Sequence, residues 1–267
     1  MLEPFQLYAR LIGAQLRAQM QYKVSFLLAF AGSFLVNIIE FGVVLILFQR
    51  IPHLVGWSLP EIALLYGLSA TTFALAETVA SALDSFQTHI VQGTFDRVLA
   101  RPRGALFQVI GEDFALRRFG RVGQGVVVLV IGLQALDIAW TWDRLLVFAS
   151  ALVCGTVIYF CIFVLGAAFC FWTVQGKEAT HVFTYGGEGL AQYPLDIYRG
   201  PVRRFFTFVV PLAFVNYEPV LYLLGRPDPL GLPDVARLAS PLAALLMVGL
   251  ATAGWRQGVR HYQSTGS

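Results

Sequence analysis

The chain has 267 residues, of which 57% are hydrophobic and 13% are charged, and its formal net charge is +3. Soluble domains usually carry about 25% charged residues, so this composition excludes an ordinary soluble globular protein and indicates that lipid surrounds most side chains. No large soluble segment interrupts the apolar runs. We therefore predict a single all-α membrane domain over residues 1–267, with the lipid bilayer as its solvent.

The N-terminal part predicts one interfacial helix and two spans. Residues 4–20 carry apolar side chains at helical spacing with polar residues mostly elsewhere, which is typical of a helix lying along the membrane surface. Residues 24–48 are long and apolar enough to cross a bilayer, and Glu40 is their one charged residue. A short loop leads to the second predicted span, residues 62–83, where the one charge is Glu77.

A polar connection separates these spans from the next two. Residues 84–121 are polar, residues 122–140 form the third predicted span, and residues 145–174 form an uncharged fourth span. The fourth run exceeds the roughly 20 residues that a bilayer needs, so we expect tilt or extension into the interface. The glycines at 120–125 lack the strand and the Gly-Lys-Ser/Thr ending of a phosphate-binding loop, and we interpret them as helix-packing residues.

Two assignments are open for the fifth span. Hydropathy favours residues 205–224, with 175–204 as a cytoplasmic loop, although prolines break that run. The alternative is residues 178–197, with 198–224 dipping into the outer leaflet and returning without crossing. Both versions contain six spans, because residues 238–255 form the last one.

The placement of Lys and Arg predicts that both termini are cytoplasmic, in a multi-pass protein of the cell inner membrane. With 205–224 as the fifth span, 15 of the 19 basic residues lie inside. With 178–197 as the fifth span, Arg199, Arg203 and Arg204 move outside, which leaves 12 of the 19 inside. The charge count therefore favours the hydropathy version, and either version favours the same orientation.

Two ordered motifs carry a family resemblance. Residues 93–102, GTFDRVLARP, resemble the G-T-[LF]-[ED]-x-L-L-x-x-P stretch of ABC-2 type permeases. Residues 193–219, which begin YPLDIY and end VNYEP, are similar to the family's F-P-x-x-x-x-P…N-P-L segment. This form looks like the ABC-2 permeases without a fused ATPase. The resemblance implies the stand-alone transmembrane subunit of an ABC exporter, and it favours 178–197 as the fifth span and 198–224 as a re-entrant outer segment.

The same resemblance implies a cytoplasmic coupling helix at residues 94–101, between the second and third spans, which docks on a separate ATPase. We expect two ATPase copies that bind ATP and Mg, no cofactor on this chain, and a second permease chain, identical or homologous, completing the path. We predict no nucleic-acid partner. The apolar side chains of this helix would pack into a cleft of the ATPase, and its charged side chains would fix the register of the contact. The expected partner contacts are Thr94, Phe95, Asp96, Arg97, Val98, Leu99 and Arg101.

Three membrane carboxylates are candidates for the translocation path: Glu40, Glu77 and Glu188. A carboxylate facing lipid costs about 2–3 kcal/mol, so these residues should face a polar path or be buried and hydrogen-bonded for packing, and the sequence leaves both open. We recognise no catalytic triad and no metal-ligand spacing, so we expect neither an enzyme nor a metal site. An ion-coupled secondary transporter using these carboxylates is the alternative function. The expected outer gate residues are Pro194, Pro201, Pro211, Asn216 and Pro219.

Overall fold

The computed structural model describes residues 4–173, 176–229 and 231–263, and this part of the chain contains helices but no named strand. The longer helices are α1 (Pro4–Met20), α2 (Lys23–Arg50), α3 (Leu59–Val79), α8 (Phe119–Gln134), α9 (Trp142–Phe169) and α14 (Ser240–His261). The shorter ones are α4 (Ser81–Asp84), α5 (Gln87–Val91), α6 (Phe95–Leu99), α7 (Ala105–Ile110), α10 (Lys177–Phe183), α11 (Tyr185–Ala191), α12 (Gly200–Phe208) and α13 (Tyr217–Leu224). Short 3-10 turns are η1 (Leu116–Arg118), η2 (Leu195–Ile197), η3 (Leu212–Phe214) and η4 (Asp234–Leu238).

Four of these helices, α2, α3, α9 and α14, are long and apolar enough to cross a membrane. They fall on the first, second, fourth and sixth predicted spans. α8 falls on the third predicted span but ends at Gln134 rather than at residue 140, because the chain turns at Ala135 and Leu136. α9 ends at Phe169, short of the predicted end at residue 174, which lies outside the described residues.

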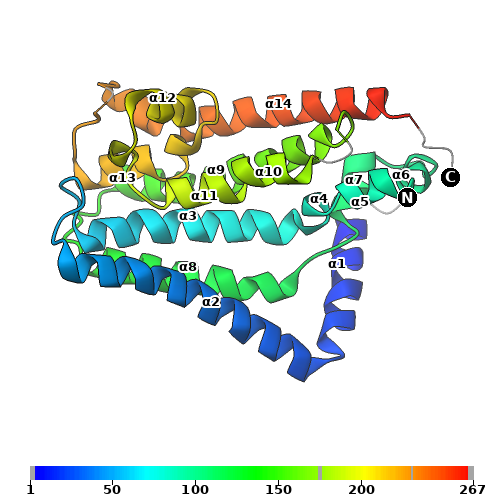
Figure 1. The fold of residues 1–267 in the computed structure, drawn as a ribbon, viewed down its shortest axis with the longest axis horizontal. Helices are drawn as coiled ribbons and strands as arrows, with labels where there is room; N and C mark the ends of the chain where they lie inside the picture. The colour runs from blue at the N-terminus through cyan, green and yellow to red at the C-terminus, as the bar shows by residue number, and fades with distance from the viewer. Residues whose placement is uncertain (1–3, 174–175, 230, 264–267) are drawn as a thin grey trace.

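The long helices run alongside one another, and α10 and α11 follow each other along the same bundle beside α9 and α3 (Figure 1). α1 lies across one end of the bundle. That end also carries α4 to α7 and the N- and C-terminal parts of the chain, whereas α12 and α13 lie at the opposite end (Figure 1). The apolar run at residues 205–224 is therefore not one helix, because its prolines divide it into part of α12, η3 and α13.

α3 is the central helix, since 89% of an apolar 18-residue stretch of it is buried, against 17% of the corresponding stretch of α2. Its closest neighbour is α8, and glycines bring the two backbones together. A Cβ added at Gly125 would lie 2.8 Å from the backbone nitrogen of Thr71, and one added at Gly120 would collide with the backbone oxygen of Phe30 in α2. The predicted packing role is thus confirmed for Gly120 and Gly125.

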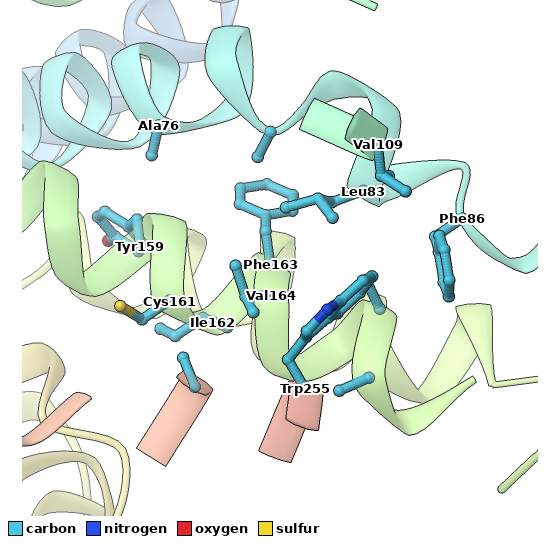
Figure 2. Packing of buried hydrophobic residues seen from close by; sticks show 14 of the residues in the cluster. Ala76, Leu83, Phe86, Val109, Tyr159, Cys161, Ile162, Phe163, Val164 and Trp255 are labelled. Atoms are coloured by element: carbon cyan, nitrogen blue, oxygen red, sulfur yellow. The ribbon is translucent and has the colours of Figure 1, made fainter. Parts of the chain in front are cut away.

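The three cysteines are free, and they belong to α9 or directly follow it. Cys161 and Cys170 are buried, and Cys154 is half-buried. Free cysteines at such positions pack as small apolar residues. Cys161 belongs to the larger of the two cores, where α3, α9 and α14 meet. Figure 2 shows this core, with Tyr159 and Phe163 of α9 along its length and Trp255 of α14 nearer to Phe86.

Candidate functional site

A short helix, α6, lies within residues 94–101, where the coupling helix is predicted, and its apolar face is turned into the chain itself. Phe95 is fully buried and Val98 is 3% exposed, so neither side chain is free to enter a cleft of a partner. Leu99 is 43% exposed. Arg97 and Arg101 are also exposed. The sequence could not separate these two groups, because a five-residue helix is too short to show which face a membrane domain covers.

Phe95 anchors α6 in an aromatic cluster built from distant parts of the chain. Its ring centroid lies 5.3 Å from that of Phe86, 5.2 Å from that of Phe171 and 5.1 Å from that of Tyr262. Trp255 of α14 stacks edge-on against Phe95 at 6.3 Å. Edge-to-face pairs of this kind add stability beyond the area that they bury. The cluster therefore joins α6 to the ends of α9 and α14.

Polar contacts complete the attachment of α6. Burial, followed by the neighbouring Asp96 carboxylate, raises the pKa of the Tyr262 hydroxyl above its ordinary value. The Thr94 hydroxyl lies 2.9 Å from Nδ1 of His89, and Nε2 of His89 lies 2.9 Å from Glu112. Asp96 and Thr94 thus interact within the chain, although Asp96 is also exposed. The other exposed members of the predicted contact set are Arg97, Leu99 and Arg101.

A buried group of charged side chains lies between α3, α8 and α11. We name it the charge cluster and define it as Glu77, Asp84, Arg118, Arg121, Tyr185 and Glu188. Arg121 of α8 is 2.8 Å from Glu188 of α11 and 3.5 Å from Glu77 of α3. Glu77 is 6% exposed and Glu188 is 4% exposed. Charges so far from water are stable in a folded chain only when each has a partner.

Arg118 and Tyr185 extend the charge cluster toward α4. Arg118 donates a hydrogen bond of 2.9 Å to the backbone oxygen of Glu77, and it lies 3.5 Å from the Asp84 carboxylate. The Tyr185 hydroxyl is 2.9 Å from Glu77 Oε1 and 3.1 Å from Asp84 Oδ2. His181 Nε2 lies 3.3 Å from the other oxygen of Asp84. The connection that carries α6 is therefore tied to the helices of the membrane domain.

The three candidate path carboxylates differ in burial and in their direct partners. Glu77 and Glu188 share Arg121, which fits the packing alternative that the sequence left open. Glu40 is on an exposed face of α2, beside Ile39 and Val43, and it is close enough to interact electrostatically with Arg121 and Glu188. The partners of these carboxylates were not predicted, because Arg118 and Arg121 fall in the polar connection at residues 84–121. One feature of the sequence could have indicated the ion pairs. A predicted span begins directly after Arg121, and two other predicted spans contain the carboxylates Glu77 and Glu188.

The predicted gate residues are dispersed at the opposite end. Asn216 donates hydrogen bonds to the backbone oxygens of Leu65 and Ala191, and so ties the segment before α13 to α3 and α11. Pro201 is exposed at the start of α12. Nearby, Asp196 accepts a hydrogen bond of 2.9 Å from the Trp57 indole and lies 3.4 Å from Arg203. The buried members are Pro194, Pro211, Asn216 and Pro219.

A family model described as an ABC-2 family transporter protein matches residues 34–266, which include α6 and the whole charge cluster. No curated protein and no solved structure is a significant match. Within the described residues, no group of three or more His, Cys, Asp or Glu side chains is arranged to hold a metal ion.

Proposed function

The chain belongs to the ABC-2 family of transporter proteins, and from this premise we propose that it is the stand-alone permease of an ABC exporter driven by a separate ATPase. Membership makes it a membrane component of an ABC transporter, and its four long apolar helices fit that role. The observation that carries the proposal is α6: it exposes Arg97, Leu99 and Arg101 while Phe95 fixes it to the core.

We infer six membrane crossings, formed by α2, α3, α8, α9, the α10–α11 pair and α14. The course of α10 and α11 along the bundle supports 178–197 as the fifth crossing (Figure 1). The position of α12 and α13 at the opposite end supports a re-entrant outer segment at 198–224. α1 and the C-terminal end of α14 lie at the same end of the bundle as α6 (Figure 1). This agrees with an even number of crossings, which puts both termini on one side of the membrane. We place this end in the cytoplasm of a cell whose inner membrane holds the protein.

The proposed energy source is ATP with Mg, bound by two copies of the partner ATPase. Their closure would push on the exposed face of α6. The aromatic cluster around Phe95 would pass this force to α9 and α14. The connection through Arg118 and Asp84 would pass it to α3, α8 and α11. Anchoring by buried rings and ion pairs suits this task, since a loosely attached helix would absorb the motion instead.

A second permease chain, identical or homologous, would complete the translocation path. This part of the proposal is supported by Glu40. Its side chain is exposed on α2, the least buried of the four helices that are long and apolar enough to cross a membrane. An ionised carboxylate facing lipid costs about 2–3 kcal/mol, and a neighbouring chain at this face would remove that cost. An ion-coupled carrier is the second candidate, supported by the same exposed carboxylate. It would work without an ATPase.

The test is site-specific photo-crosslinking in cells of the native host. A photoreactive residue at position 99 should capture an ATPase chain, which mass spectrometry would identify. The same group at position 235, where Val235 is 77% exposed at the other end, is the matched control and should capture none. Absence of an ATPase from both products, with transport surviving ATP depletion, would replace the exporter by the ion-coupled carrier.

A further inference from the structure

A notch lies where α1 turns into α2, and neither the transport cycle nor the charge cluster uses it. It encloses about 230 Å³ and is lined by Gln19, Tyr22, Ser25, Phe26, Ala29 and Arg117. The lining therefore comes from three separate stretches of sequence, namely the end of α1, the start of α2 and η1. None of the lining residues is acidic.

The wall of this notch is fixed by two long-range hydrogen bonds. Gln15 donates to the backbone oxygen of Gly111 over 2.8 Å, and Gln19 donates to that of Phe114 over 2.7 Å. These bonds hold α1 against the segment that carries Arg117. The position of the Arg117 backbone relative to α1 and α2 is thus set before any ligand arrives.

Arg117 differs from the two other arginines in this part of the chain. Arg118 and Arg121 are committed to buried carboxylates. Arg117 is exposed, and among the described residues it makes no ion pair with a carboxylate. A guanidinium is well suited to phosphate, because its planar donors match the phosphate oxygens. Lys23, exposed at the first residue of α2 and next to Tyr22 in the sequence, adds positive charge to this part of the surface.

The remaining lining has the amphipathic character of a lipid. The hydroxyls of Tyr22 and Ser25 supply hydrogen-bond donors, and Phe26 and Ala29 supply an apolar surface farther along α2. In the orientation proposed above, on which this inference rests, the notch faces the cytoplasmic boundary of the bilayer. We propose that it binds an anionic phospholipid of the inner leaflet, with the phosphate on Arg117 and the first acyl carbons against Phe26.

The test uses the full-length protein in nanodiscs of equal phosphatidylglycerol and phosphatidylcholine, followed by native mass spectrometry of the lipids that remain bound. The wild-type protein should retain phosphatidylglycerol in preference to phosphatidylcholine. R117Q should weaken that retention about tenfold, since a hydrogen-bonded charge pair is lost. R103Q removes an exposed arginine outside the notch and should behave like the wild type.

Equal retention by R117Q and R103Q would overturn the proposal. Displacement of phosphatidylglycerol by millimolar inorganic phosphate would also overturn it, in favour of a free-phosphate site. F26S should weaken retention of the lipid, whereas a phosphate site would be indifferent to it. The assay contains no ATPase and no cargo, so its failure leaves the proposed transport function untouched.

Discussion

Arg121 in α8 and Glu188 in α11 form a 2.8 Å ion pair from which water is largely excluded. The same guanidinium lies 3.5 Å from Glu77 in α3, so one cation connects three helices. α11 has seven residues and is separated from α10 at Thr184. A helix of this length is not stable alone, so its position depends on such contacts.

The first prediction concerns this ion pair. R121Q should destabilise the protein by about 3–5 kcal/mol, because it leaves Glu188 buried without its cation and removes one of the two arginines beside Glu77. R121Q/E188Q should cost less than the sum of the two single changes, since it removes both members of the pair. Thermal unfolding in detergent would measure the stability of the two single variants and the double variant, with R204Q as a control at an exposed position. Additive effects would show that the two residues do not interact.

The second prediction concerns the exposed charges of α6. R97E/R101E should insert and fold normally, because both side chains are exposed and changes there usually cost less than about 0.5 kcal/mol. The partner that we propose must match these cations with acidic groups, so charge reversal should lower stimulation of its ATPase at least about tenfold. R199E/R204E, at the opposite end, is the control. Unchanged stimulation in the first variant would contradict the coupling role.

The third prediction separates anchoring from contact within α6. F95A should destabilise the permease by about 3–5 kcal/mol, because it empties the centre of the aromatic cluster. L99A should leave stability nearly unchanged and weaken ATPase binding, because Leu99 is 43% exposed. Denaturation curves and co-purification yields would distinguish the two. A large loss of stability in L99A would place that side chain in the core instead.

The fourth prediction concerns the α3–α8 contact. G125A should destabilise the protein by about 1–3 kcal/mol, because the new methyl group would press on the backbone of Thr71. Gly42 in α2 has open space around it, so G42A is the matched control and should be neutral or slightly stabilising. G125A and G42A would be compared by the yield of monodisperse protein and by its melting temperature. A tolerated G125A would mean that the two helices are less tightly packed.

The long apolar helices were predictable because hydropathy and length alone specify them, and α1, α2, α3, α9 and α14 fall where the sequence placed helices. The fifth crossing was harder. Three glycines between 186 and 189 interrupt the less apolar segment, while the more apolar run at 205–224 is divided by prolines. Neither segment is one continuous helix, so hydropathy and helix length do not decide between them, and the fifth crossing stays a prediction.

Only part of the candidate site could be predicted from the sequence. Residues 93–102 located α6 by their motif, but its two faces depend on where Phe171, Trp255 and Tyr262 lie in the fold. The charge cluster joins residues 67 positions apart in Arg121 and Glu188. Such pairs cannot be inferred from one sequence, because any of several basic residues could have balanced the same carboxylates.

The close approach of α3 and α8 limits which parts of the molecule can change shape. Where Gly125 places one backbone directly on another, there is no side-chain layer that could slide or repack. The two helices must then travel as a single rigid body, and a hinge has to lie at other points of the chain. The break at Thr184 between α10 and α11 is one such point.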